Sequence, residues 1–220
     1  MLESVLGPPV SVCSTRTDTA PVVVHAEEET DVARAVPARR AEYATVRHCA
    51  RTALRAIDVP PGPLPRGAGG APVWPAEVVG SMTHCRGYRA AAVARTVHVR
   101  SLGIDAEPDE PLPRGVLELV TRPGERAALP LLQRSRPGVH WDRLTFSAKE
   151  SVYKAWFPLT GRWLDFDDAE VHLTPDGGLV AELLVPGPRV DGAPLTRFTG
   201  RWSVASGIIT TAVVVPAGSD

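Results

Sequence analysis

Two acidic residues lie two positions apart in the segment GIDAEP, residues 103–108. On a β-strand, Asp105 and Glu107 point to the same face, so their carboxylates converge. Carboxylates that close repel each other unless a cation or a proton lies between them. Ligation by a few carboxylates, with water and phosphate completing the shell, is typical of Mg²⁺. Taken alone, the pattern is common, and a solvated pair at the end of a strand is its more frequent explanation.

The segment FSAKESVYKAW, residues 146–156, places Glu150 and Lys154 four positions apart, on one face of a helix. One interpretation is a surface ion pair, worth only about 0.3–0.5 kcal/mol. Against it, the segment is rich in aromatic residues, and Lys149 and Lys154 are the only lysines among 24 basic residues. An ammonium and a guanidinium are not interchangeable at a phosphate or metal site, although codon usage also explains scarce lysines. The segment favours a carboxylate and an ammonium that complete a metal site and hold a phosphate.

The segment GSMTHC, residues 80–85, combines glycine, small hydroxyls and His84, which we expect in a turn. Such a turn can present N–H, O–H and imidazole donors to an anion. A zinc site is excluded because no second Cys/His pair follows at ligand spacing. A single loop histidine is usually structural, so this segment is weak evidence by itself.

A basic helix supplies further candidate anion ligands. Helical periodicity places Arg39 within the arc of its apolar face and Arg47 at the edge of that arc, whereas Arg40, Arg51 and Arg55 turn progressively towards solvent. A guanidinium near a buried face needs a carboxylate or a phosphate as partner. Two arginines that extend along the apolar surface to reach water explain the pattern equally well.

The elements that must position these residues follow from hydrophobic periodicity and from proline and glycine. Two long helices, each followed by antiparallel strands, favour an α+β fold with two similar subdomains. We predict helices over 37–57, over 112–132 (one or two short ones, interrupted by Pro123) and over 141–156, ending near Pro158, with a loop over 59–75. The predicted strands are a strand–turn–strand over 90–107 and single strands over 169–173, 179–185, 197–204 and 208–215.

The composition excludes several classes of function. A net charge of −1 over 220 residues gives no general attraction to nucleic acid or to an anionic membrane. No run reaches the roughly 18 apolar residues of a membrane span, and Pro8 and Pro9 interrupt any signal-peptide pattern. The three cysteines, Cys13, Cys49 and Cys85, are widely separated, which argues against a disulfide framework and favours the reducing cytoplasm.

Taken together and in this order, GSMTHC, GIDAEP and FSAKESVYKAW resemble the Sfp-type 4'-phosphopantetheinyl transferases, in particular the actinobacterial branch related to the siderophore-synthesis (enterobactin synthetase component D-like) enzymes. The segments EYATVRHCARTAL, PVWP, GYRAAAVAR, HWDR, KAWFPLT and GRWSV extend the resemblance from about Arg39 to the C-terminal strands. The resemblance implies a pseudo-twofold α+β fold of two subdomains, residues 1–103 and 104–220, with coenzyme A in the cleft between them. It also implies transfer of 4'-phosphopantetheine to a serine of an acyl, polyketide or peptidyl carrier protein.

The same resemblance assigns roles to single residues. Asp105, Glu107 and Glu150 match Mg²⁺ ligands, and Ala106 lies at a variable position where its backbone or a water serves instead. Glu150 is the expected base for the carrier serine, Lys154 matches the pyrophosphate-binding lysine, and Asp105 is also expected in catalysis. The positions expected around coenzyme A are Asp105, Glu150 and Lys154 together with Arg39, Arg47, Arg66 (where relatives often have lysine), Gly67, Ala68, Gly69, Thr83, His84, Lys149 and Trp163, the last near the pantetheine arm.

Two other functions stay open at this point. One is a Mg²⁺-dependent coenzyme A pyrophosphatase, in which water attacks and no carrier is needed. The other is a non-catalytic module that binds coenzyme A or a carrier protein. Mn²⁺ takes the same oxygen ligands as Mg²⁺. An internal pseudo-dimer favours a monomer, with neither nucleic acid nor a membrane as partner.

Overall fold

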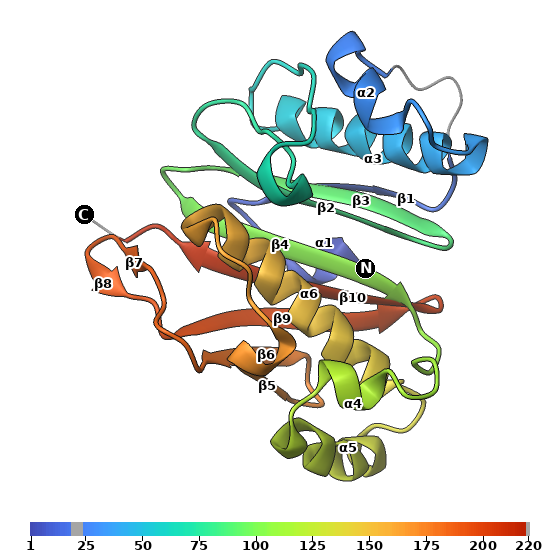
Figure 1. Ribbon diagram of the computed structural model, residues 1–220, viewed down its shortest axis with the longest axis vertical. Helices are drawn as coiled ribbons and strands as arrows, with labels where there is room; N and C mark the ends of the chain where they lie inside the picture. The colour runs from blue at the N-terminus through green and yellow to red at the C-terminus, as the bar shows by residue number, and fades with distance from the viewer. Residues whose placement is uncertain (19–23, 219–220) are drawn as a thin grey trace.

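The chain folds as two α+β halves, each made of a long helix on an antiparallel sheet (Figure 1). The computed structural model describes residues 1–18 and 24–218. In the first half, helix α3 (Pro37–Arg55) packs on a three-stranded sheet of order β1-β3-β2. Its strands are β1 (Ser11–Thr15), β2 (Val78–Cys85) and β3 (Tyr88–Arg95).

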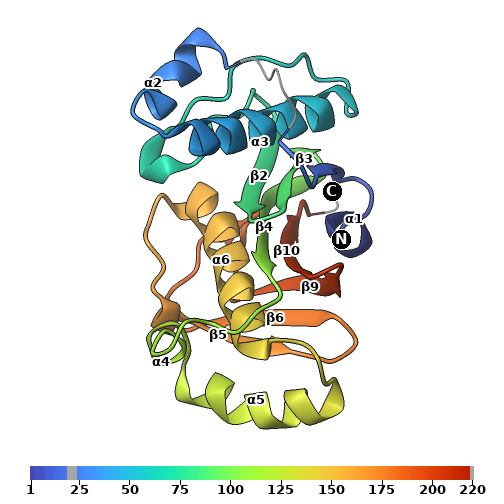
Figure 2. The ribbon, with the colours of Figure 1, turned by 90° about the vertical axis from the view of Figure 1, so that its right-hand side faces the viewer.

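The second half contains a five-stranded antiparallel sheet of order β4-β10-β9-β6-β5. Helix α6 (Trp141–Thr160) lies across β4 and β10, as Figures 1 and 2 show. Tryptophans dominate the core beneath it, where the rings of Trp141 and Trp202 meet edge to face with centroids 5.1 Å apart. The strands are β4 (Val99–Pro108), β5 (Ala169–Leu173), β6 (Gly178–Leu183), β9 (Arg197–Ala205) and β10 (Ile208–Pro216).

Shorter elements complete the two halves. Helix α5 (Pro123–Ser135) lies at the end of the molecule opposite α3 (Figures 1 and 2). The others are α1 (Leu2–Val5), α2 (Glu29–Val32), α4 (Leu117–Val120), the 3₁₀ turns η1 (Ala26–Glu28), η2 (Ala68–Gly70) and η3 (Phe166–Asp168), and the two-residue strands β7 (Arg189–Val190) and β8 (Ala193–Pro194).

Strand β4 connects the two halves. It pairs with β10 in the second sheet, and the N–H of Ala106 also donates to Thr83 Oγ1 of β2 at 3.0 Å. A Cβ atom on Gly103 would lie only 1.9 Å from the carbonyl oxygen of Ser151 in α6. Glycine therefore lets α6 pack directly on the β4 backbone. This close packing brings the acidic end of β4 next to the charged face of α6.

Most predicted elements are confirmed. The α+β class is as expected, the helix predicted over 37–57 is α3, and all four predicted C-terminal strands are present. Helix α6 continues through Pro158 and ends at Thr160, where Gly161 adopts the left-handed conformation of a helix cap (φ 62°).

Two predictions at this level are wrong. Residues 80–85 form part of strand β2 instead of a turn, because they pair with β3. Pro123 begins helix α5 instead of interrupting a helix, since the first turn does not need its N–H. The subdomain boundary at 103/104 stays a prediction, and it lies within β4. Among the residues that the structure describes, none of the helices combines the length and apolarity that crossing a membrane requires.

Candidate active site

A cleft of about 480 Å³ lies where the first half meets α6. One wall comes from α3, from the loop over 66–74 and from β2, and the other comes from the C-terminal part of α6. Of the residues predicted around coenzyme A, the cleft is lined by Arg39, Arg47, Arg66, Gly67, Ala68, Gly69, His84, Glu150 and Lys154.

Asp105 is the most buried acidic residue beside this cleft, with 5% of its surface exposed. Its Oδ1 accepts hydrogen bonds from Lys154 Nζ at 2.7 Å and from Thr83 Oγ1 at 3.2 Å. Its Oδ2 accepts from Ser147 Oγ at 2.8 Å. Lys154 Nζ also donates to the carbonyl of Ile104 at 3.1 Å. The carboxylate of β4 and the ammonium of α6 are thus held together by the fold, although Asp105 and Lys154 lie far apart in the sequence.

Two glutamates lie near Asp105, and the Asp105 charge acts on both. Burial and repulsion from Asp105 raise the pKa of Glu107 to about 6, although Arg143 Nη1 lies 3.0 Å from Glu107 Oε2. Burial and the same repulsion also raise the pKa of Glu150. Asp105 therefore disfavours the charge of both glutamates, the repulsion that the close spacing of Asp105 and Glu107 implies.

The donor set of this acidic cluster suits a hard divalent cation, because it consists of carboxylate oxygens under mutual repulsion. Within residues 1–18 and 24–218, no three His, Cys, Asp or Glu side chains lie close enough to share a metal ion. Asp105 is instead bound to Lys154, and Glu107 to Arg143. Ala106 contributes no side chain here, since its methyl group is buried in the core of the sheet.

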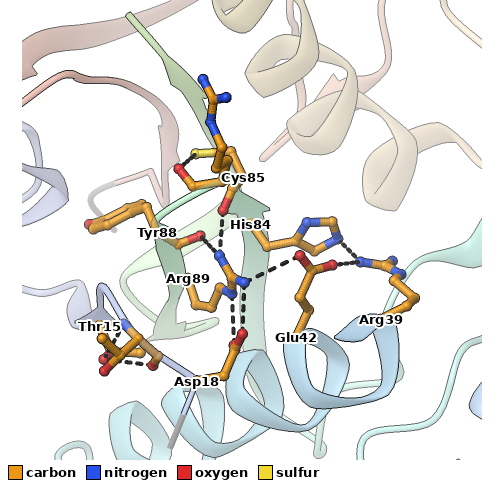
Figure 3. A network of polar contacts seen from close by, with 10 residues as sticks. Thr15, Asp18, Arg39, Glu42, His84, Cys85, Tyr88 and Arg89 are labelled. Atoms are coloured by element: carbon orange, nitrogen blue, oxygen red, sulfur yellow. Dashed lines mark hydrogen bonds and ion pairs between the residues drawn. The ribbon is translucent and has the colours of Figure 1, made fainter. Parts of the chain in front are cut away.

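Arg39 and His84 meet at the edge of the cleft (Figure 3). Arg39 Nη1 donates to His84 Nε2 and to Glu42 Oε2, the latter at 3.2 Å. Although the His84 side chain is exposed, the protein atoms around its ring and the nearby Arg39 charge lower its pKa to about 4. His84 is therefore neutral near pH 7, and its Nε2 can accept a hydrogen bond from the Arg39 guanidinium.

Deeper in the cleft, two guanidiniums share one aromatic ring. Arg47 lies 3.4 Å from the Tyr43 ring centroid, and Arg66 lies 5.8 Å from it. Arg47 Nε donates to the Leu64 carbonyl at 3.2 Å, and burial lowers the pKa of its guanidinium. Tyr43 is fixed in turn by a 2.6 Å hydrogen bond from its hydroxyl to Asp31. Stacking on Tyr43 keeps both cations in the cleft wall without neutralising them.

The loop between these arginines and β2 closes one side of the cleft. The N–H of Arg66 donates to Asp31 Oδ2 at 2.9 Å, which ties the loop to α2. Gly69 has φ 62°, and a Cβ atom there would lie 2.3 Å from the Phe157 ring of α6. Glycine at this position therefore allows the loop to touch the opposite half.

Four predicted orientations differ in the structure. The Lys149 ammonium is turned away from the cleft, into a buried ion pair with Glu125 at 2.9 Å. Thr83 is buried and bonds to Asp105 instead of facing an anion. Trp163 lies outside the cleft, 70% exposed, with its ring centroid 4.9 Å from that of Tyr153. Arg51, expected towards solvent, is buried against Glu28.

Sequence reasoning missed residues that position the site without facing it. Ser147 binds Asp105, Arg143 binds Glu107, and Tyr43 supports the arginines. The contact between Tyr43 and Arg47 could have been predicted from the sequence, because residues one helical turn apart lie on the same face. The roles of Ser147 and Arg143 depend on how α6 packs on β4, which periodicity does not reveal.

The fold and cleft together define a class of protein that binds a polyanionic ligand between two α+β halves, with an acidic cluster beside the cations. Residues 27–94 match the family model of the 4'-phosphopantetheinyl transferase N-terminal domain, and residues 101–193 match that of the 4'-phosphopantetheinyl transferase superfamily. The chain belongs to the 4'-phosphopantetheinyl transferases, a family of enzymes.

Three curated relatives support this assignment. The 4'-phosphopantetheinyl transferase Svp of Streptomyces mobaraensis is 60% identical over 88% of this chain and 80% of its own length. PptT of Mycobacterium tuberculosis is 51% identical over 86% of this chain and 85% of the relative, and Npt of Nocardia iowensis is 48% identical over 86% and 88%. The resemblance to Sfp-type enzymes of actinobacteria is thereby confirmed.

Proposed function

We propose that this enzyme moves 4'-phosphopantetheine from coenzyme A to a serine of an acyl, polyketide or peptidyl carrier protein, in a Mg²⁺-dependent reaction. The observation that carries the proposal is one cleft with a cationic wall and an acidic end. The cationic wall is formed by Arg39, Arg47 and Arg66, with the neutral His84 beside Arg39. Glu150 and Lys154 line the other end, where Lys154 pairs with Asp105 and Glu107 lies close by.

The cationic wall suits the nucleotide part of coenzyme A, which carries a pyrophosphate and a 3'-phosphate. Charge-assisted hydrogen bonds from a guanidinium to a phosphate are roughly twice as strong as hydrogen bonds between neutral groups. Arg39 and His84 lie together at the edge, whereas Arg47 and Arg66 lie deeper on Tyr43. These two separated groups, Arg39 with His84 and Arg47 with Arg66, match a ligand with two separated phosphate groups.

The reaction itself needs a base, a charge to stabilise the phosphates and a leaving group. The serine hydroxyl attacks the phosphorus that bears pantetheine, and its proton passes to Glu150, whose raised pKa suits a general base. The bond from that phosphorus to the bridging oxygen breaks, and adenosine 3',5'-bisphosphate leaves. Lys154, whose ammonium lines the cleft, neutralises charge on the pyrophosphate.

Asp105, Glu107 and Glu150 would hold the metal ion, which supplies positive charge to the pyrophosphate when bound. The Lys154 ammonium, which pairs with Asp105 Oδ1 at 2.7 Å, would lie between this carboxylate and the coenzyme phosphates. Mn²⁺ would serve in the same position. We propose that the pantetheine arm lies along Tyr153 and Trp163, whose rings are in contact at a tilt of 56° and, with Glu150, line a second, smaller hollow.

We also infer that the protein is a monomer with two subdomains. The turn before β4 is a better boundary between these subdomains than residue 103, which lies inside the strand. The cytoplasmic location stays a prediction from cysteine usage.

The test is incubation of the protein with coenzyme A, Mg²⁺ and, in turn, a fatty-acid, a polyketide and a peptidyl carrier. One carrier should gain about 340 Da by intact mass, and EDTA should prevent the gain. A pyrophosphatase would release free phosphopantetheine without any carrier, and a binding module would leave coenzyme A intact. If all three carriers stay unmodified, the proposed transfer is wrong.

A further inference from the structure

Glu42 places a negative charge beside a residue that is expected to bind phosphate. It lies one helical turn after Arg39 on α3, and its Oε2 is 3.2 Å from Arg39 Nη1. A carboxylate in this position competes with phosphate for the same guanidinium. Glu42 would therefore weaken the anion site unless its charge were shared with a second cation.

Arg89 of β3 is that second cation (Figure 3). Its Nη2 lies 3.2 Å from Glu42 Oε1, so Glu42 bridges two guanidiniums with one oxygen for each. Arg39 is thus bound by a single carboxylate oxygen. Within the described part of the chain, the contacts of Arg39 with Glu42 and His84 both use Nη1. Its other N–H groups are left to a ligand.

Arg89 cannot bind the ligand itself. Its side chain is only 8% exposed, and Asp18 holds it with two hydrogen bonds of 2.9 Å, to Nε and Nη2. Its Nη1 donates to the carbonyls of Cys85 and Tyr88. A guanidinium with all three nitrogens occupied by protein groups acts on the cleft only through Glu42.

We propose that Arg89, held by Asp18 and acting through Glu42, is a positioning residue for the Arg39–His84 phosphate pair. Loss of Arg89 frees Glu42 to turn both oxygens to Arg39 and so removes that guanidinium from phosphate. The inference rests on the proposed binding of coenzyme A, and it gives the N-terminal segment around Asp18 a role in affinity. It requires no change in the chemical step, since none of these groups reaches Glu150 or Lys154.

The test compares Arg89→Met with Arg95→Met. Arg95 lies at the other end of β3, where it donates to the carbonyls of Ile57 and Asp58 at 2.9 and 3.0 Å, away from the cleft. Arg89→Met should raise the KM and the Kd for coenzyme A about tenfold, the loss of one charge-assisted contact, and leave kcat within about twofold. Arg95→Met should leave both constants unchanged.

A double variant separates positioning from a general loss of structure. If Arg89 acts through Arg39, then Arg89→Met should add no further loss of affinity in an Arg39→Ala background. Asp18→Asn, which removes an exposed partner of Arg89 and perturbs folding least, should weaken coenzyme A binding in the same direction. Additive losses, equal effects of Arg89→Met and Arg95→Met, or a fall in kcat at constant KM would each overturn the proposal.

Calorimetry of coenzyme A binding without a carrier keeps this proposal distinct from the proposed function. A wild-type protein that binds coenzyme A but modifies no carrier would contradict the transfer reaction, and the variants would still test the role of Arg89 through Kd.

Discussion

At the scale of single residues, Asp105 organises the acidic end of the cleft. It receives hydrogen bonds from Thr83, Ser147 and Lys154, and its charge raises the pKa of Glu107 and of Glu150. Such repulsion is tolerated at a site that a cation later occupies. Asp105, Glu107 and Glu150 would hold the metal, and Asp105 Oδ1 is paired with Lys154 at 2.7 Å.

Removing this carboxylate therefore tests the metal site. Asp105→Ala or Glu107→Ala should lower the rate of transfer at least about a hundredfold, because phosphoryl charge then lacks its counter-ion. Raised Mg²⁺ should partly restore the Glu107 variant, whereas Glu110→Ala, at an exposed ion pair just beyond β4, should behave as wild type. Near-normal rates for both site variants, measured by carrier mass, would remove the metal from the account.

The two arginine environments on α3 give a second prediction at this scale. Arg47 lies in the cleft wall on Tyr43, whereas Arg55 is exposed at the end of the helix. Arg47→Ala should raise the KM for coenzyme A about ten- to a hundredfold, and Arg55→Ala should change it little. Dephospho-coenzyme A, which lacks the 3'-phosphate, shows which phosphate each residue contacts. His84→Ala should raise the KM for coenzyme A but not the KM for the dephospho form. Equal effects at Arg47 and Arg55 would indicate only a diffuse basic surface.

At the scale of elements, η1 and α2 hold the loop that carries Arg66. Glu28 is fully buried, pairs with Arg51, and accepts a hydrogen bond of 2.7 Å from the N–H of Leu64. Burial alone would raise the pKa of Glu28, but hydrogen bonds from His25 and Leu64 and the Arg51 charge lower it overall. A carboxyl whose pKa is lowered by folding stabilises the protein above its unfolded pKa.

Replacement of Glu28 should accordingly cost stability. Glu28→Gln removes a buried negative charge that pairs with Arg51, so we expect a loss of about 3–5 kcal/mol in the free energy of unfolding. The wild-type advantage should be full near pH 7 and disappear as the pH falls below the ordinary glutamate range. Urea unfolding at several pH values measures it, with the exposed neighbour Glu27→Gln as control. A variant as stable as the control at pH 7 would contradict this role.

Elements with strong periodicity could be predicted, but orientations set by packing could not. Helix α3 and the C-terminal strands follow from apolar spacing and turn residues, whereas β2 was missed because Gly80 and His84 suggested a turn. The orientation of Lys149 could not be predicted for the same reason. Lys149 is next to Glu150 in the chain, but one residue corresponds to a 100° rotation around α6, so Lys149 points towards Glu125 instead. This pairing depends on how α5 packs against α6. Family resemblance predicted the site residues, but it did not distinguish Thr83, which supports Asp105, from residues that face the cleft.

At the scale of the whole molecule, function depends on the meeting of the two halves. The cationic wall belongs to the first half, the base and the ammonium to α6, and β4 connects them. Neither half alone contains the site. Two glycines allow close packing against α6, Gly69 against Phe157 and Gly103 against Ser151. In the proposed reaction, a cleft built this way would hold the coenzyme across the interface and leave Glu150 at the acidic end for the carrier serine.

The most direct test of this account is single-turnover transfer to a carrier at saturating coenzyme A, for wild type and for Glu150→Gln. The account predicts that wild type adds one phosphopantetheinyl group to the carrier. It predicts that Glu150→Gln binds coenzyme A with similar affinity but transfers at least about a hundredfold more slowly, the usual contribution of a general base. Transfer by Glu150→Gln at the wild-type rate would contradict the assigned base, and wild-type hydrolysis of coenzyme A without carrier modification would contradict the assigned reaction.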